Sequence, residues 1–397
     1  MQRFIMHDVF MNTYHRLPLV FTEGSGAQLT DNQGHTYVDF TSGIAVNCLG
    51  HKHPALVKAI SDQAARLIHT SNYYLSNTSI AFAEELVGAC KTVGMERVFF
   101  CNSGAEANEG AIKIARKYAQ SRYGNGRHRI VTLTGSFHGR TLTTLSATGQ
   151  DRFHPDSFAP YTEGFIFVEP HDLRAMDKAL DGTVAAVLME PVQGESGIRP
   201  LEIHYVQEVA RLCKERDVLL MFDEVQSGVG RTGTFLASEI YKVQVDVVTL
   251  AKGLSGGVPV GAVLAGVKTA GTLGVGDHGS TFGGNPLAAA AGLAVLSVVN
   301  QPAMLGEISR KGNLIMDTLR SWQHPAIREV RGRGLMIGID ITGDAWPVLE
   351  SGLERGLLLL SAGQKTLRLL PPYVITDEEM DKGLRILKSL LDAVPHK

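Results

Sequence analysis

The sequence predicts an α/β protein with a large domain built on a mostly parallel sheet and a smaller α+β domain at the C-terminal end. Short, continuously apolar runs alternate with helical stretches in the middle of the chain, whereas the last third changes to long helices and paired strands. Continuous apolar strands separated by helices are typical of parallel sheets that are covered on both faces. The composition, with 44% hydrophobic and 20% charged residues, is ordinary for a globular protein.

The first ninety residues predict two short strands followed by two helices. Residues 26–40 indicate strands on either side of a turn at Asp31–Gly34. A second helix is expected from about Ser79 to Cys90. The first helix is expected after Pro54, because apolar residues follow it at helical spacing, namely Leu56, Ile60, Ala64 and Leu67.

Seven apolar runs are the predicted strands of the large sheet. In sheets of this type ligands bind beyond the carboxyl ends of the strands, so the residues that follow each run are candidates for the site. The runs are Val98–Cys101, Ile130–Leu133, Gly164–Val168, Val184–Met189, Val218–Phe222, Val245–Leu250 and Gly261–Ala265.

The last third of the chain predicts a separate α+β domain. An apolar segment from Pro286 to Val299 predicts a long buried helix, and Thr376 with Glu379 forms a capping box that starts a final amphipathic helix. Between them we expect a helix near 303–321 and strands at Leu335–Ile341, 357–361 and 366–370. The predicted parts are an N-terminal segment that packs with the small domain, the large domain and the small domain: residues 1–45, 46–290 and 291–397.

Bulk properties exclude several classes of function. A formal net charge of −2 provides no broad attraction to nucleic acid or to an acidic membrane. No apolar run is long enough to span a bilayer, and residues Met1–Asn12 lack the features of a signal peptide. Four cysteines without a CxxC pair indicate a reduced, intracellular protein. We therefore expect a cytoplasmic protein that binds neither nucleic acid nor membrane.

The first candidate segment follows the run Val98–Cys101, where Ser103, Gly104 and Ala105 begin a predicted helix. Small residues at a helix N-terminus expose backbone N–H groups, and the helix dipole adds positive potential, so the segment suits a phosphate group. A helix cap with small residues for tight packing explains the same pattern equally well.

The second candidate segment, Gly135–Arg140, contains an aromatic ring and a cation. Phe137 can stack on a flat cofactor, and Arg140 can hold a carboxylate with its bidentate fork. Taken alone, a core phenylalanine and a surface arginine are the simpler interpretation. His138 is a possible catalytic base, although a lone loop histidine is weak support for one.

The third candidate segment places two acids, Glu190 and Glu195, in a glycine-containing loop after the run Val184–Met189. One of them can serve as a general acid or base, or as the partner of a mobile arginine. Solvated loop acids are the alternative.

An acid and a lysine follow two further predicted strands, so both should lie at the same edge of the sheet. The run Val218–Phe222 leads directly into Asp223, which needs a cation, a metal or a donor because burying an unpaired charge is costly. The run Val245–Leu250 leads to Lys252, and a desolvated lysine has a lowered pKa and becomes nucleophilic, as Schiff-base enzymes require.

Together these segments meet the requirements of one cofactor, pyridoxal 5'-phosphate (PLP). This cofactor needs a phosphate cradle, a stacking ring, an acid on its pyridine nitrogen and a lysine imine. The acid keeps the nitrogen protonated so that the ring accepts electrons, and the lysine moves the proton.

Two competing patterns are less consistent with the sequence. Gly228–Gly233 fits the GxGxxG pattern of dinucleotide sites, but Asp223 and Glu224 precede it and would repel a pyrophosphate. We interpret it as a glycine loop near the active site. No metal site is expected, because no second ligand cluster accompanies Cys48, His51 and His53.

Along nearly its whole length the sequence resembles the class III aminotransferases, in particular the acetylornithine aminotransferase group. The resemblance implies an aspartate-aminotransferase-like large domain, the type I fold of PLP transferases, and a homodimer. The segments that carry it are Thr13–Pro18, Asp39–Ile44, Gly50–Pro54, Asn102–Glu109, Phe137–Arg140, Asp223–Gln226, Gly230–Gly233, Ala251–Leu254, Ser280–Pro286 and Arg368–Pro372.

The same resemblance implies roles around the cofactor. Lys252 would hold PLP as a Schiff base and shuttle the proton, while Asp223 would pair with the pyridine nitrogen. Phe137 would stack on the ring, and Thr281 of the partner subunit would reach the phosphate. The other implied cofactor contacts are Ser103, Gly104, Ala105, Glu224, Val225 and Gln226.

For the substrates, the resemblance implies that Arg140 binds the α-carboxylate and that Ser280 of the partner subunit also contacts substrate. Arg368 would receive a carboxylate of 2-oxoglutarate, and Glu195 would mask Arg368 in the other half-reaction. One site could then accept both a cation-bearing amine and a dicarboxylate. We expect only small loop effects where serine replaces a common glycine of the family, at Ser196 and Ser255.

The expected reaction is ping-pong transamination of N2-acetyl-L-ornithine with 2-oxoglutarate, a step of arginine biosynthesis. Ornithine, succinylornithine, acetyl-lysine and 4-aminobutyrate stay open as amines, because acyl preference depends on pocket shape. A PLP aminomutase is an alternative of another class and would need no 2-oxoglutarate. A nucleotide-binding or regulatory protein that uses the glycine loop would carry no coloured cofactor.

Overall fold

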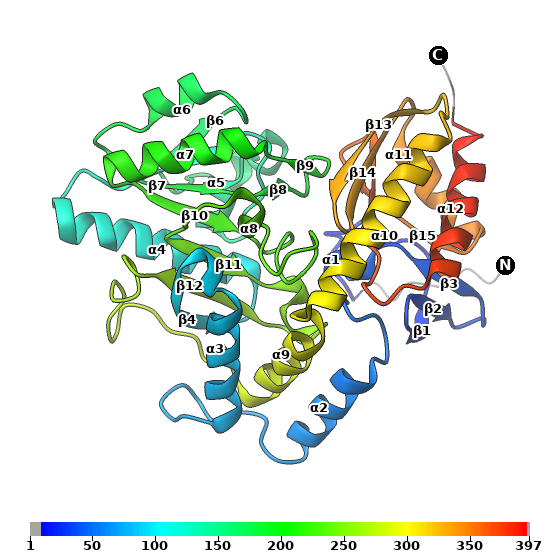
Figure 1. Ribbon diagram of the computed structural model, residues 1–397, viewed down its shortest axis with the longest axis horizontal. Helices are drawn as coiled ribbons and strands as arrows, with labels where there is room; N and C mark the ends of the chain where they lie inside the picture. Colours follow the sequence, from blue (N-terminus) through cyan, green and yellow to red (C-terminus); the bar gives the residue numbers. More distant parts are fainter. Residues whose placement is uncertain (1–8, 395–397) are drawn as a thin grey trace.

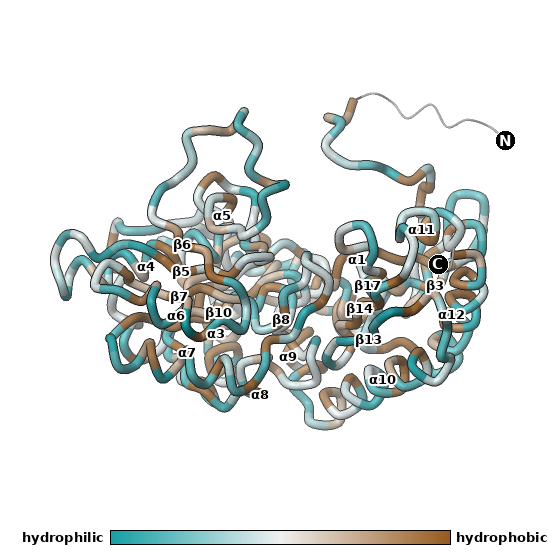
Figure 2. The backbone as a smooth tube through the Cα atoms, turned by 90° about the horizontal axis from the view of Figure 1, so that it is seen from above, coloured by the Kyte–Doolittle hydropathy of each residue, from teal (hydrophilic) through white to brown (hydrophobic). Residues whose placement is uncertain are grey.

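The computed structural model describes residues 9–394 and shows two lobes that lie side by side (Figure 1). The larger lobe holds a seven-stranded sheet and the smaller lobe holds two four-stranded sheets. The expectation that Met1–Asn12 is not a signal peptide concerns a segment whose residues 1–8 lie outside the described part of the chain. Figure 2 shows the hydrophobic segments concentrated in the strands and the hydrophilic ones on outer turns and helices.

The large sheet confirms the mostly parallel arrangement that the apolar runs predict. Strand β12 is antiparallel to both of its neighbours, and the other adjacent pairs are parallel. The spatial order is β4 (Met95–Cys101), β12 (Gly261–Gly266), β11 (Val247–Leu250), β10 (Leu219–Asp223), β7 (Val184–Met189), β5 (Arg129–Leu133) and β6 (Phe165–Val168).

The continuous apolar character of these strands follows from helices on both faces of the sheet. Alternate residues of a strand point to opposite faces, so Leu188 of β7 packs in the same core cluster as α4 (Gly104–Tyr123). Val187 belongs instead to the cluster that contains α7 (Ile203–Arg216). The other helices of this lobe are α3 (Asn77–Ala89), α5 (Leu142–Ala147), α6 (Leu173–Ala179) and α8 (Ser238–Tyr241).

The smaller lobe combines both ends of the chain, as the blue and red segments in Figure 1 show. One sheet has the order β1 (Phe21–Ser25), β2 (Gln28–Asp31), β3 (Thr36–Asp39) and β15 (Leu357–Leu358), in which β3 and β15 are parallel. The second sheet is antiparallel and has the order β13 (Ile327–Arg333), β14 (Met336–Ile341), β17 (Thr366–Leu369) and β16 (Leu360–Ala362). The domain boundaries expected from the sequence stay a prediction.

Along the chain, α9 (Pro286–Val299) and α10 (Pro302–Ser321) follow the last strand of the large sheet and precede β13 of the smaller lobe. Helices α11 (Ala345–Glu354) and α12 (Asp377–Leu391) complete the smaller lobe. In α12 the predicted capping box is confirmed, because Thr376 Oγ1 accepts from the Glu379 N–H at 3.1 Å. No single helix of the described residues is both long and apolar enough to cross a membrane, although α9 and α10, bent by 72°, pass that test as a pair.

Three local predictions are wrong. Helix α2 (Pro54–Ala64) ends before Leu67, whose side chain is 41% exposed. The strand expected at 357–361 is two strands, β15 and β16, which belong to different sheets. Strands β1 and β13 are not predicted from the sequence, because their exposed and polar residues form neither an apolar run nor a regular alternation. Pairing partners from distant parts of the chain, which local periodicity cannot show, decide these elements.

Candidate functional site

A cavity of about 580 Å³ lies at the carboxyl ends of the strands of the large sheet. The segments that follow β4, β5, β7, β10 and β11 meet there, as the topology of a parallel sheet predicts. Of the residues singled out from the sequence, the following line it: Ser103, Gly104, Ala105, Phe137, His138, Arg140, Glu190, Glu195, Asp223, Val225, Gln226 and Lys252.

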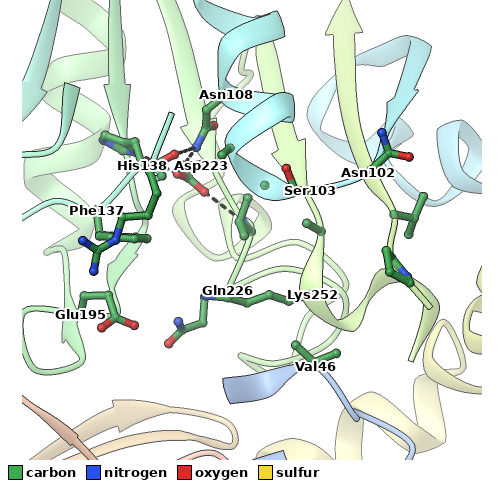
Figure 3. A pocket seen from close by; sticks show the side chains of 18 of the residues that line it. Val46, Asn102, Ser103, Asn108, Phe137, His138, Glu195, Asp223, Gln226 and Lys252 are labelled. Carbon is green, nitrogen blue, oxygen red and sulfur yellow. Dashed lines mark hydrogen bonds and ion pairs between the residues drawn. The ribbon is translucent and has the colours of Figure 1, made fainter. Parts of the chain in front are cut away.

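Asp223, the last residue of β10, forms one end of the cavity and is 4% exposed. Its Oδ2 accepts a hydrogen bond from Asn108 Nδ2 at 2.7 Å and lies 2.8 Å from His138 Nδ1, and its Oδ1 accepts from the Val225 N–H at 3.0 Å. Figure 3 shows these side chains joined by dashed lines, with Lys252 extending beneath them. Three hydrogen-bond partners satisfy the buried carboxylate and fix its orientation in the cavity.

Asn108 is a residue that the sequence reasoning missed. It lies on the buried face of α4, where Nδ2 also donates to the His138 carbonyl at 2.7 Å and Oδ1 accepts from Thr249 Oγ1 at 2.7 Å. The network therefore joins α4, β10, β11 and the loop after β5. A polar amide on an otherwise small and apolar helix face is the signal that could have identified it.

Lys252 follows β11 after one residue and adopts a left-handed backbone conformation, with φ of +45°. Its ammonium group has no hydrogen bond or ion pair within residues 9–394. Burial lowers the pKa of Lys252, although the carboxylates of Glu195 and Asp223 oppose that effect. The neutral amine is the nucleophilic form, so this environment favours covalent chemistry at Lys252.

The N-terminus of α4 faces the same cavity. Ser103 caps the helix, with Oγ accepting from the Glu106 N–H at 3.2 Å, and Gly104 and Ala105 form the first turn. A Cβ atom on Gly104 would lie 2.7 Å from Val225 Cγ1, so only glycine permits this approach between two strand ends. The free N–H groups of a 20-residue helix offer an anion site.

Phe137 and Arg140 lie on one wall of the cavity. The Phe137 N–H donates to Glu190 Oε1 at 2.7 Å, and its ring contacts Phe153 edge to face with centroids 5.5 Å apart. The guanidinium carbon of Arg140 lies 4.2 Å from the Phe153 centroid. Arg140 is thus held against aromatic rings with its donors open to the cavity, which is suitable for a carboxylate.

Glu190 and Glu195, the two acids of the segment that follows β7, have different environments. Glu190 is buried and accepts from the N–H groups of Phe137 and Gly194, at 2.7 and 2.9 Å. Burial and the nearby charge of Asp223 raise the pKa of Glu190. We infer that Glu190 holds two loops together at the wall of the cavity.

Glu195 instead forms an ion pair with a residue of the smaller lobe. Its Oε1 lies 2.6 Å from Nη1 of Arg368, a buried residue of β17. Although burial opposes the effect, Arg368 and Lys252 lower the pKa of Glu195. Glu195 lines the cavity and Arg368 does not, so this charged pair joins the two lobes beside the cavity.

Glu224 lies away from the cavity, which corrects the expectation from the sequence. Its side chain is fully buried and accepts from the N–H groups of Ala237 and Ser238, at 2.5 and 2.8 Å. Burial raises the pKa of Glu224 to about 7. Glu224 follows the end of β10, and its hydrogen bonds to the Ala237 and Ser238 N–H groups hold its side chain away from the cavity.

Within the residues that the structure describes, Ser280 and Thr281 do not line this cavity. They line an adjoining surface hollow together with Asn102, whose Nδ2 donates to Ser280 Oγ at 3.2 Å. No group of three or more metal-binding side chains occurs among the residues that the structure describes. Of the two serines at common glycine positions, Ser196 donates to Gln193 Oε1 at 3.3 Å and Ser255 is buried against the Val258 carbonyl.

The loop Gly228–Gly233 was expected near the active site, but none of its residues lines the cavity. It packs against the smaller lobe, where the fully buried Arg231 donates to the carbonyls of Leu335 and Pro371 at 3.0 and 2.6 Å. A Cβ atom on Gly230 would lie 2.6 Å from Val299 Cγ1. The glycines of this pattern permit close packing between lobes. Sequence reasoning also missed other cavity residues, among them Tyr14, Val46 and the segment Gly257–Val260.

Comparisons with known proteins agree with this architecture. The profile of the family Aminotransferase class-III matches residues 9–391. An acetylornithine aminotransferase from Caldanaerobacter subterraneus is 46% identical over 97% of both chains. The crystal structure of N-acetylornithine aminotransferase from Stenotrophomonas maltophilia superposes with a TM-score of 0.84 at 40% identity, covering 96% of this chain and 97% of that one. Ornithine aminotransferase from Toxoplasma gondii has a TM-score of 0.91 at 35% identity, covering 97% and 93%.

Proposed function

Because the chain belongs to the class III aminotransferases, we propose that it transfers the distal amine of N2-acetyl-L-ornithine to 2-oxoglutarate, with PLP as its cofactor. The products are N-acetyl-L-glutamate 5-semialdehyde and L-glutamate, and the step serves arginine biosynthesis. Relatives named for acetylornithine support the amine, and the contacts of Arg368 support the dicarboxylate.

The residues around the cavity fit PLP. A buried carboxylate held by three donors, a lysine without a partner in residues 9–394 and the open N-terminus of α4 surround one space. Gln226 Oε1 is buried there without a hydrogen-bond partner in the described chain, so the cavity offers a further unused polar atom. When bound, PLP supplies an electron sink for the bond that breaks at the amine-bearing carbon.

In this proposal Asp223 would hold the proton of the pyridine nitrogen, and the N–H groups of Gly104 and Ala105 would bind the phosphate. Phe137 and Val225 would contact the flat ring. Lys252 would hold the cofactor, and its free amine would move the proton of the amine-bearing carbon. Its lowered pKa keeps a larger neutral fraction available for this transfer.

The observation that carries the proposal is the ion pair between Glu195 and Arg368 beside Lys252. While the amine substrate occupies the site, Glu195 neutralises Arg368. When 2-oxoglutarate binds, the carboxylate next to its reacting carbonyl carbon takes the place of Glu195 on Arg368, and Arg140 holds the distal carboxylate. A single cavity thus accommodates both substrates of a ping-pong reaction.

We further propose a cytoplasmic homodimer in which Ser280 and Thr281 complete the cavity of the partner subunit. Both residues lie outside the cavity of their own chain, in the adjoining hollow. The segment Tyr73–Leu75 and Phe282 expose large apolar side chains, between 60% and 94% of their surface, which is typical of an interface. Sedimentation velocity tests this assembly, and a monomer at micromolar concentration would contradict it.

The test of the function is the visible absorption of the purified protein during titration with single substrates. We expect a yellow band that acetylornithine bleaches more effectively than ornithine, succinylornithine or 4-aminobutyrate and that 2-oxoglutarate restores. The Lys252→Ala variant should lack the band, and Lys268→Ala, at an exposed lysine outside the cavity, should retain it.

The outcomes separate the parts of the proposal. Preferential bleaching by ornithine, the amine in the name of the Toxoplasma gondii enzyme, would keep the chemistry and change the substrate. No band after addition of PLP would contradict the proposed cofactor.

A further inference from the structure

The loop that carries Glu195 connects β8 (Val192–Gln193) to β9 (Arg199–Pro200) and lies on the face of the β13–β14–β17 sheet. In that sheet Gly338 of β14 is directly opposite Arg331 of β13 on one side and Arg368 of β17 on the other. Residues directly opposite each other in an antiparallel sheet share a face. Two arginines therefore flank one position that has no side chain.

The backbone of the Glu195 loop fills the space above Gly338. A Cβ atom on Gly338 would lie 2.7 Å from the Gly197 carbonyl oxygen and 3.0 Å from Ile198 Cβ. Gly197 has a φ of +115°, and a Cβ atom there would lie 2.8 Å from Arg331 Nη2. Loop and sheet are thus in direct backbone contact, with no room for a side chain at either glycine.

Arg331 holds the loop in this place from one side. Its Nε and Nη2 donate to the Gly197 carbonyl oxygen at 2.9 and 2.6 Å, and Nε also donates to the Ile198 carbonyl oxygen at 3.1 Å. The remaining donors bind Asp340 Oδ1 at 2.8 Å and Glu329 Oε2 at 2.7 Å, so the guanidinium orientation is fixed. Arg331 is 9% exposed, and its planar fork serves carbonyls and carboxylates together.

Arg368 binds the same loop from the other side of Gly338, through the Glu195 carboxylate. We propose that Arg331 is a positioning residue that fixes the Gly197 carbonyl and thereby sets how readily Arg368 exchanges Glu195 for the carboxylate of the acceptor. The inference rests on the proposed function, since it concerns the balance between the two half-reactions. Arg331 lines no part of the cavity and is not itself a catalytic residue.

The experiment measures the two half-reactions separately in the holoenzyme by stopped-flow absorption, with acetylornithine for the first and 2-oxoglutarate for the second. In Arg331→Gln the Gly197 carbonyl loses its hydrogen bonds from the guanidinium group, so the loop holds Glu195 less firmly and Glu195 neutralises Arg368 less well. We expect kcat/KM for the amine to fall relative to kcat/KM for 2-oxoglutarate by about tenfold, the size of a typical coupling between neighbouring residues. Arg331→Lys should restore part of the ratio, because an ammonium group can still donate to the Gly197 carbonyl.

Two further variants keep the inference testable. Arg328→Gln removes an exposed arginine of the same strand, β13, whose side chain forms no hydrogen bond or ion pair within residues 9–394, and the ratio should stay within twofold of the unmodified enzyme. Gly338→Ala retains Arg331 and pushes on the Gly197 carbonyl instead, so it should shift the ratio in the same direction as Arg331→Gln.

An equal fall of both half-reactions in Arg331→Gln and Gly338→Ala would show a merely structural role and overturn the inference. An unchanged ratio in a folded Arg331→Gln variant would also overturn it. If the unmodified protein reacts with neither substrate, the proposed function fails and not the role of Arg331. If Arg331→Gln does not fold, the ratio in Gly338→Ala decides alone.

Discussion

The two ends of the cavity hold their carboxylates in different ways. Asp223 is bound by Asn108, His138 and the Val225 N–H, all of which belong to the large lobe. Glu195 is bound across the lobes by Arg368, a residue of the smaller sheet. The first carboxylate has three donors that keep it in place, whereas the second pairs with a single arginine, to which we propose that a substrate carboxylate also binds.

This difference indicates which groups hold still during the reaction and which exchange. A carboxylate with several short hydrogen bonds inside one packed core loses all of them if it moves, so Asp223 provides a fixed charge. An ion pair between two lobes can separate when another carboxylate replaces one partner, so Glu195 and Arg368 suit a site with two substrates. Substitutions at Asp223 and at Arg368 should therefore have different effects.

The largest effect is expected at Asp223, the carboxylate that is held entirely within the large lobe. Asp223→Asn removes the charge while keeping the size of the side chain, and we expect kcat for transamination to fall by about 10³-fold or more, as for other preorganised charges in active sites. Steady-state rates at saturating substrate measure it. A fall of less than tenfold would contradict the role of Asp223.

Substitution of Arg368, the partner of Glu195, should change the kinetics of one substrate more than those of the other. Arg368→Gln removes the cation that 2-oxoglutarate is proposed to bind, and we expect KM for 2-oxoglutarate to rise by about 100-fold. The amine half-reaction should change less, because acetylornithine is not proposed to bind Arg368. Equal losses in both half-reactions would remove the distinction between the two ends of the cavity.

Asn108 tests whether the network behind Asp223 matters. Asn108→Ala removes the donor to Asp223 Oδ2 and the acceptor for Thr249 Oγ1, and a hydrogen bond to a charged group contributes about 1.5–3 kcal/mol. We expect kcat to fall about 10- to 100-fold, without an increase of KM for 2-oxoglutarate. Thr249→Val, which removes only the outer hydrogen bond, is the matched control and should lower kcat less than Asn108→Ala does.

Glu224 provides the contrast between adjacent acids. Its pKa is raised to about 7 in the folded protein, so the folded state binds a proton more tightly than the unfolded chain does. Stability should therefore fall as the pH rises from about 4.5 to about 7. Glu224→Gln should flatten this slope and lower the free energy of unfolding by about 1–3 kcal/mol, because its amide faces an N–H donor.

Denaturant unfolding at several pH values measures the stability effect of Glu224→Gln. The kcat of the folded variant should stay within about threefold of the unmodified enzyme, since Glu224 lies outside the cavity. A loss of activity as large as that of Asp223→Asn would mean that the two acids act together, against the observed geometry.

Much of the site could be predicted from the sequence, because it lies at strand ends. Asp223 and Lys252 follow apolar runs, and a parallel sheet brings the ends of its strands to one edge whatever the details of packing. Asn108, Tyr14 and Val46 could not be predicted in this way. They lie on a helix and in N-terminal segments, and their position in the cavity depends on how distant elements pack.

By itself, the sequence determined the large sheet, the helix at Pro286–Val299 and the capping box at Thr376, because local periodicity and capping chemistry are sufficient for these features. Only the tertiary structure decided that Glu224 turns away from the cavity and that the glycine loop around Arg231 packs between the lobes. The same holds for Arg331 and Arg368, which flank Gly338. Strand register sets which residues are opposite each other, and pairing between strands distant in sequence leaves no periodic pattern in the chain.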